Sequence, residues 1–122
     1  MIKYLALVFL GGGLGSALRY YFSVAVNSQE IQWLPTFMVN LLGCMAVGFI
    51  FGIYDKQSIT QSWYLLLGMG FCGGLTTFST FSLEMFSLLK QHDYLGTFTY
   101  LSVSILGGLL FVFLGMWLSK LV

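Results

Sequence analysis

The chain has 122 residues, of which 58% are hydrophobic and only 7% charged, and its formal net charge is +1. Soluble domains carry roughly 45–50% apolar and about 25% charged residues, so this chain lacks the polar residues that would cover a globular surface. The composition predicts an integral membrane protein, and without a cluster of Lys or Arg it predicts no nucleic-acid partner.

Four apolar segments follow one another, each of the length that a membrane-spanning helix needs, about 20 residues. The first begins like a signal peptide, but its apolar pattern resumes after Arg19, so we expect a retained helix that ends at the polar residues 27–30. The second begins near Trp33, an aromatic residue typical of the membrane interface. We therefore predict an all-α membrane protein with a single four-helix domain, residues 1–122, and helices over residues 2–26, 33–54, 63–90 and 94–121.

The third predicted helix is the least regular of the four. Adjacent glycines at 73–74 and adjacent threonines at 76–77 lower helix propensity, so we expect an interruption between residues 72 and 77. Hydroxyl groups and the carboxylate of Glu84 follow at a depth where polar groups are costly. Non-helical backbone survives at that depth only inside protein or beside a water-filled cavity, so this segment is the predicted functional site.

Basic residues favour no single orientation in the membrane. Four spans place both termini on one side, and positive charge in short loops sets orientation. The two sides then carry three basic residues against two: Lys3, Lys56 and Lys120 against Lys90 and Arg19. One sequence could thus insert both ways and form an antiparallel homodimer, while a fixed orientation set by Lys56 and Lys120 remains the alternative.

Two pairs of glycines recur at four-residue spacing, Gly11 with Gly15 and Gly48 with Gly52. Such pairs let helix backbones approach closely in lipid. General helix packing explains each pair alone, and together the pairs indicate tight assembly.

The residue types of an enzyme are missing from the spans. The sequence has one histidine, His92, in a polar loop, so Ser79 and Thr80 have no base to activate them. Glu84 lacks a carboxylate partner, and a Gly-x-Gly-x-x-Gly pattern at residues 68–73 has no strands around it to form a dinucleotide site. We expect that the protein is not an enzyme.

An ion pathway fits these residues better. Phe78 and Phe81 share a helix face, and the positive edges of their rings could meet a small anion without binding it tightly, although core packing would also explain the pair. The amide of Asn40 could donate to an anion or to a neighbouring helix. On the fourth helix, Tyr100 and Ser104 share a face and offer hydroxyls to an ion or to neighbouring helices.

Arg19 has two possible roles. It could extend to the interface as a structural residue, which we favour, or raise the local anion concentration at a vestibule. The position that continues the polar face of the fourth helix, Gly108, carries no hydroxyl, so the row of hydroxyls is expected to stop there.

Three motifs together resemble the bacterial fluoride channel family (Fluc, also called CrcB): GGGLGSALRY at residues 11–20, VNLLG at 39–43 and GFCGGLTTFSTF at 70–81. They occur in order and at appropriate separations, and the last is very specific. The resemblance implies an antiparallel dual-topology homodimer in the bacterial inner membrane, with two pathways for passive export of fluoride.

The resemblance also implies roles for individual residues. Asn40 would coordinate fluoride, and Phe78 and Phe81 would line the pathway with their ring edges. Backbone carbonyls of Gly73 and Thr76 would hold a structural sodium ion at the dimer interface. The full set implied for the fluoride pathway is Asn40, Phe78, Ser79, Thr80, Phe81, Glu84, Tyr100 and Ser104.

Two other classes of protein remain as alternatives. A proton-coupled small multidrug antiporter has the same size and antiparallel plan but needs a central carboxylate in an open cavity, and Glu84 lies toward one end of its helix. A non-transporting assembly subunit would need only the glycine pairs, which would leave Asn40 and the two phenylalanines without a purpose.

Overall fold

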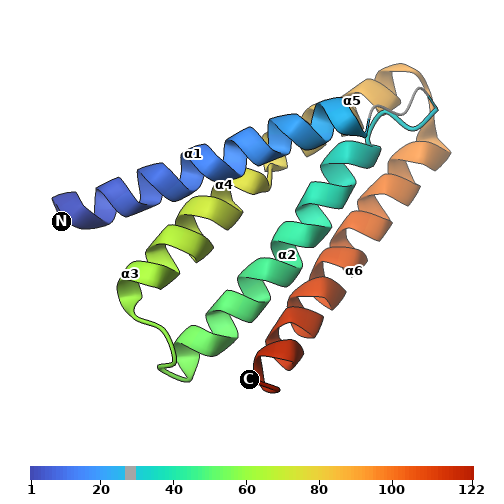
Figure 1. The fold of residues 1–122 in the computed structure, drawn as a ribbon. Helices are drawn as coiled ribbons and strands as arrows, with labels where there is room; N and C mark the ends of the chain where they lie inside the picture. Colours follow the sequence, from blue (N-terminus) through green and yellow to red (C-terminus); the bar gives the residue numbers. More distant parts are fainter. Residues whose placement is uncertain (27–29) are drawn as a thin grey trace.

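The computed structural model is all-helical and describes residues 1–26 and 30–122 (Figure 1). Most of the polar segment predicted at residues 27–30 therefore lies outside the described residues. Four helical segments of the described chain are long and apolar enough to cross a membrane, as predicted. In chain order the elements are α1 (Ile2–Ala25), α2 (Leu34–Asp55), α3 (Gln61–Tyr64), the π-helical η1 (Leu65–Cys72), α4 (Gly73–Leu75), α5 (Phe78–Lys90) and α6 (Tyr94–Ser119).

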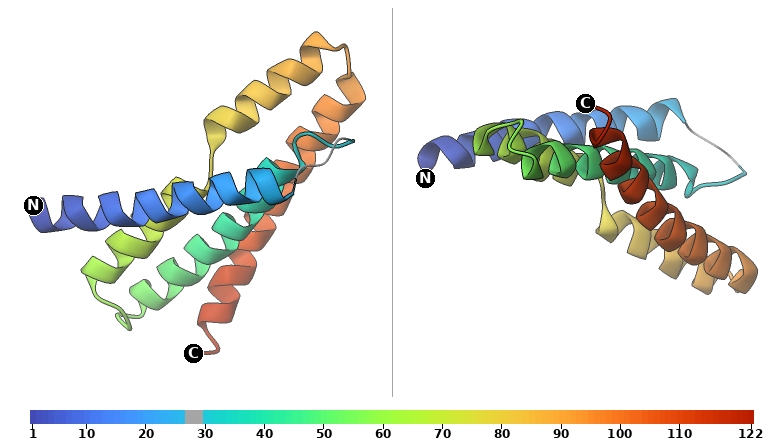
Figure 2. Two further views of the ribbon diagram at one scale, coloured as in Figure 1. Left: turned by 45° about the horizontal axis from the view of Figure 1, so that its top comes forward. Right: turned by 90° about the horizontal axis from the view of Figure 1, so that it is seen from below.

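Helices α2 and α6 lie side by side in direct backbone contact (Figures 1 and 2). A side-chain carbon added at Gly48 would collide with the backbone carbonyl of Val112, and one added at Gly52 would collide with the hydroxyl of Ser119. Glycine at these positions therefore brings the two helices close enough for van der Waals contact along much of their length.

Helix α1 lies across η1 and α4 in the same way. An added carbon at Gly11 would meet the carbonyl of Leu66, and one at Gly15 would meet the carbonyl of Phe71. Both glycine pairs singled out in the sequence thus pack helices of one chain against each other. This is the general helix packing that explains each pair alone, and tight assembly with a partner stays a prediction.

Only Thr76 and Thr77 are extended between α4 and α5, with ψ angles of 158° and 122°. Helix α5 then turns away from α4 and lies beside α6 (Figure 2). The glycines at 73–74, which the sequence placed in the interruption, are helical. The reason is tertiary packing, because Gly74 lies against the backbone of Gly12 on α1, and this contact offsets a weak helix propensity.

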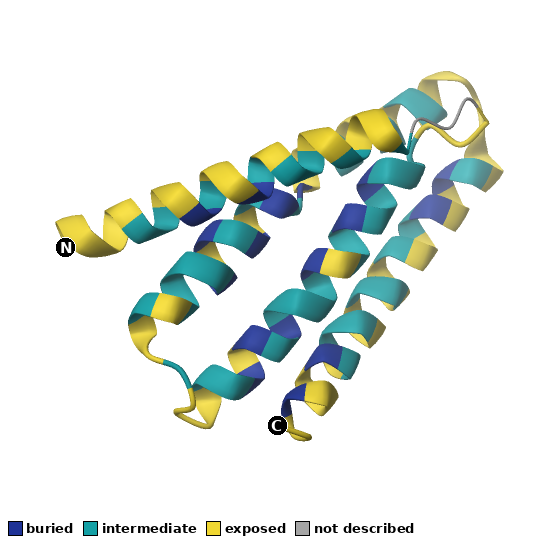
Figure 3. Cartoon of the chain, viewed as in Figure 1, coloured by how far each residue is buried: buried dark blue, intermediate teal, exposed yellow. Residues whose placement is uncertain are grey.

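Few side chains are buried within the single chain. The buried apolar residues are Val39, Ile50, Cys72, Leu75 and Tyr100. Exposed residues cover the outer faces of α1 and α6 (Figure 3). Because many of these exposed residues are large and apolar, lipid or a second protein chain must cover them.

The packing of α1 can be tested with two glycines on that helix. Gly15→Ala should lower the midpoint of thermal unfolding in detergent, since overpacking costs about 1–3 kcal/mol. Gly13→Ala is the matched control, because an added carbon there meets no atom within 4 Å. It should leave the midpoint unchanged or raise it, as alanine is the better helix former by about 1 kcal/mol. Equal midpoints for the two variants would contradict this packing.

Candidate functional site

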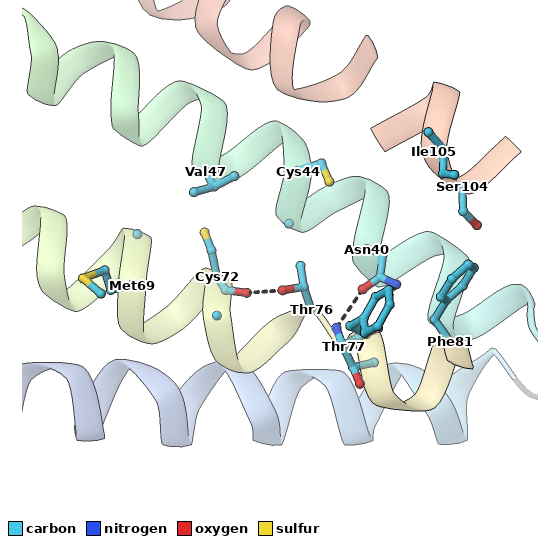
Figure 4. A pocket seen from close by; sticks show the side chains of 14 residues that line it. Asn40, Cys44, Val47, Met69, Cys72, Thr76, Thr77, Phe81, Ser104 and Ile105 are labelled. Carbon is cyan, nitrogen blue, oxygen red and sulfur yellow. Dashed lines mark hydrogen bonds between the residues drawn. The ribbon is translucent and has the colours of Figure 1, made fainter. Parts of the chain in front are cut away.

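The interruption of the third span is held by the side chain of Asn40 on α2 (Figure 4). The backbone N–H of Thr77 donates to Asn40 Oδ1 at 2.8 Å, and Asn40 Nδ2 donates to the carbonyl of Thr77 at 3.2 Å. The amide therefore bonds both backbone groups of one extended residue, as a neighbouring β-strand would. Its second N–H has no acceptor among the described residues and remains for another ligand.

This arrangement frees backbone carbonyls at the end of α4, among them those of Gly73 and Thr76. In a continuous α-helix the N–H of Thr77 would bond the carbonyl of Gly73, and the N–H of Thr80 would bond that of Thr76. The first N–H is taken by Asn40, and the second donates to Thr77 Oγ1 at 3.2 Å, which caps α5. The carbonyl oxygens of Gly73 and Thr76 are thus available to a ligand from outside the helix.

A pocket of about 480 Å³ lies beside the interruption, between α2, η1, α5 and α6 (Figure 4). It brings together four of the predicted pathway residues, Asn40, Phe78, Phe81 and Ser104, which come from three different helices. The rings of Phe78 and Phe81 lie 5.9 Å apart, and the first is 79% exposed. Gly73 and Thr76 also line this pocket.

A second hollow of about 320 Å³ contains Arg19 and Thr80 together with Thr36. No carboxylate is paired with this arginine among the described residues, and its neighbours in the hollow carry hydroxyl groups. Thr77 lines both hollows, so the two come close to each other at this residue. The lining suits the vestibule interpretation of Arg19 as well as the structural one, and its role remains a prediction.

Ser79 lies outside both hollows. It is exposed, and its Oγ is 3.2 Å from Thr77 Oγ1. Thr77 Oγ1 also lies 3.1 Å from Thr80 Oγ1, to which it donates. These hydroxyls therefore stabilise the first turn of α5 in the described chain.

Glu84 and Tyr100, which the sequence singled out separately, are hydrogen-bonded to each other. The hydroxyl of Tyr100 donates to Glu84 Oε2 at 2.7 Å, and that of Thr36 donates to Glu84 Oε1 at 2.7 Å. The carboxylate thus joins α2 and α6 to α5. Tyr100 is fully buried and makes an edge contact with Phe81, with ring centroids 4.9 Å apart.

Sequence reasoning missed Thr36 and Thr77 as members of the site. Thr36 lies one helical turn before Asn40, so the two share a face of α2, and this spacing could have identified it. The role of Thr77 comes from its extended backbone, which residue types alone do not show.

The hold of Asn40 on the interruption can be measured by hydrogen–deuterium exchange. Asn40→Leu should speed amide exchange around Thr77 by roughly tenfold or more, because it removes two hydrogen bonds of about 0.5–1.5 kcal/mol each. Cys44→Ala is the control, since Cys44 lines the same pocket one turn further along α2. Unchanged exchange in Asn40→Leu would show that the interruption is held by other contacts.

Comparisons with known proteins identify the family of the chain. The family described as CrcB-like protein, Camphor Resistance (CrcB), matches residues 6–116. A protein of Phocaeicola vulgatus named fluoride-specific ion channel FluC is 44% identical over 121 residues, which cover 98% of this chain and 100% of the relative. Proteins with the same name from Gloeothece citriformis and Pyrococcus horikoshii are 43% and 40% identical, and the matches cover 93% and 97% of this chain and 94% and 97% of the relatives. The chain therefore belongs to the CrcB family.

Proposed function

We propose that this protein is a fluoride-selective ion channel through which fluoride leaves the cell passively. The observation that carries the proposal is the pocket beside the interruption, where Asn40 has a spare N–H close to Phe78, Phe81 and Ser104. An amide N–H, a hydroxyl and the positive edges of phenyl rings attract a small anion. No Lys or Arg lines this pocket, so the anion would not be held too tightly to leave.

The relatives are named as fluoride-specific channels, and their sequences match this chain over nearly its full length. Their names therefore support fluoride as the ion. The protein is a transporter rather than an enzyme. The antiporter alternative is not favoured, because both oxygens of Glu84 accept hydrogen bonds from hydroxyl groups and Glu84 lines neither hollow.

Passive export has a simple driving force. Hydrogen fluoride enters an acid-stressed cell as a neutral molecule and dissociates inside, and the trapped anion then leaves through the channel. A negative-inside potential assists the anion by about 2.3 kcal/mol per charge per 100 mV. The four spans make this a multi-pass membrane protein, and we place it in the bacterial inner membrane.

We further propose that two copies form an antiparallel dual-topology homodimer with two pathways. The pocket and the exposed ring of Phe78 support this, because a partner or lipid must cover them. The near balance of basic residues between the two sides supports insertion in both orientations. In such a dimer the interrupted third spans of the two subunits would meet.

A structural sodium ion at that interface fits the residues present. The free carbonyls of Gly73 and Thr76 are oxygen ligands of the kind that hard cations prefer, and two subunits would double their number. Gly73 is exposed, and no atom lies within 4 Å of a side-chain carbon built on it, so a partner could approach. The ion would hold the subunits together and take no part in transport.

Fluoride efflux from liposomes tests the function directly. Liposomes that contain the purified protein and potassium fluoride should release fluoride rapidly when valinomycin is added, as measured with a fluoride electrode. Efflux should not require a proton gradient, and chloride should not substitute. An absence of fluoride release, or release that depends on proton exchange, would contradict a channel.

Two variants on α5 connect that flux to the pocket. Phe81→Ile removes the ring beside Asn40 and should abolish efflux while the dimer persists in size-exclusion chromatography. Phe86→Ile is the matched control, since Phe86 lies on the same helix, is exposed and lines neither hollow. Similar efflux from both variants would show that the pathway lies elsewhere.

The sodium proposal has a separate test, because backbone carbonyls cannot be removed by substitution. Protein purified without sodium and reconstituted with potassium fluoride in sodium-free solutions should lose valinomycin-dependent fluoride efflux, and added sodium should restore it. Full efflux without sodium would argue against a sodium ion at Gly73 and Thr76, and would leave the fluoride pathway itself untouched.

A further inference from the structure

We propose that Trp33 is a positioning residue for the anion pathway, because its indole ring fixes the Tyr100 ring and through it Glu84 and Phe81; this role rests on the channel function proposed above. The rings of Trp33 and Tyr100 are stacked, with centroids 4.5 Å apart and planes 18° from parallel. Tyr100 has no exposed surface, and such a stacked pair limits the rotation of its ring.

The position of this ring determines two contacts beside the pocket. With the ring in its observed orientation about the Cα–Cβ bond, the hydroxyl of Tyr100 donates to Glu84 Oε2 at 2.7 Å. In that orientation the ring also meets Phe81, with centroids 4.9 Å apart and planes at 67°. Phe81 lines the pocket, so the row of contacts runs from Trp33 through Tyr100 to the pathway.

Two residues at the start of α2 influence the Glu84 carboxylate, one directly and one through Tyr100. Thr36 donates directly to Glu84 Oε1, and Trp33, which caps the same helix three residues earlier, acts on the other oxygen through Tyr100. Residues three apart lie on the same side of a helix, so the two contacts come from one face. Loss of the indole would leave the donor to Glu84 Oε2 without its stacked neighbour, while the bond from Thr36 to Oε1 would be unaffected.

The surroundings of Trp33 differ from those of the other two tryptophans. Its ring contacts Phe37 as well as Tyr100, with centroids 5.8 Å apart in the first pair. Trp63 and Trp117 are 54% and 48% exposed, and neither has an aromatic ring packed against it in the described part of the chain. The location of Trp33 at the membrane interface stays a prediction, and its ring contacts give it a second role there.

A double-mutant cycle in the liposome assay tests this role. Trp33→Leu should slow fluoride efflux about three- to tenfold, the range that a lost aromatic pair supports. Trp33→Phe keeps a ring beside Tyr100 and should restore most of the efflux, and Trp117→Leu, the control, should leave it unchanged. Tyr100→Phe removes only the hydroxyl that donates to Glu84.

The combination distinguishes positioning from general stability. If Trp33 acts through Tyr100, Trp33→Leu should lower efflux less in the Tyr100→Phe background than in the wild type, because the connection through the hydroxyl to Glu84 is already broken there and only the ring contact with Phe81 remains. The same full decrease in both backgrounds would overturn the proposal, as would unchanged efflux in Trp33→Leu alone. Trp33→Met replaces Trp33→Leu throughout if the leucine variant is not monodisperse. A wild-type protein that released no fluoride would instead contradict the proposed function.

Discussion

Two hydrogen bonds between the Asn40 side chain and the backbone of Thr77 determine most of what is distinctive in this structure. An extended residue inside a membrane span leaves polar groups that lipid cannot satisfy. The amide of Asn40 satisfies both groups of Thr77, and the direction of α5, the pocket and the free carbonyls at residues 73 and 76 all follow from that. The interruption is therefore a contact between two helices as much as a property of the third span.

Glu84 shows the same principle with a side chain. A carboxylate at membrane depth is costly unless hydrogen-bond donors surround it. Here hydroxyl groups from Thr36 and Tyr100 meet its two oxygens, and no buried side-chain polar atom in the described residues lacks a partner. The donors that stabilise this carboxylate come from α2 and α6, so the polar group also fixes the relative position of three helices.

The sequence predicted the spans well because a membrane helix is identified by its length and hydrophobicity, which are local properties. It also predicted that Asn40 and the rings of Phe78 and Phe81 belong to one site, and one pocket contains them. The glycines at 73–74 were placed wrongly because contact with α1 decides their conformation. No residue pattern in the sequence predicts the π-helical segment η1, since its conformation depends on how the third span fits against α1 and α2.

The contacts that complete the site were out of reach for a different reason. Thr36 and Glu84 are 48 residues apart, and a hydroxyl gives no sign of which carboxylate it will meet. Trp33 has the composition and position of an interfacial residue, and only the packing of α6 against the start of α2 shows its second partner. Contacts of this kind are set by how the helices pack against one another, so the sequence alone does not predict them.

The position of Thr77 between the two hollows has an electrical consequence. A membrane voltage falls mainly across the part of a protein that conducts least, because water-filled spaces carry ions and hold nearly constant potential. If water fills both hollows and each opens to a different side of the membrane, the field is concentrated across the protein between them, which includes the extended residue Thr77. An anion that crosses there would feel most of the driving voltage in a single step.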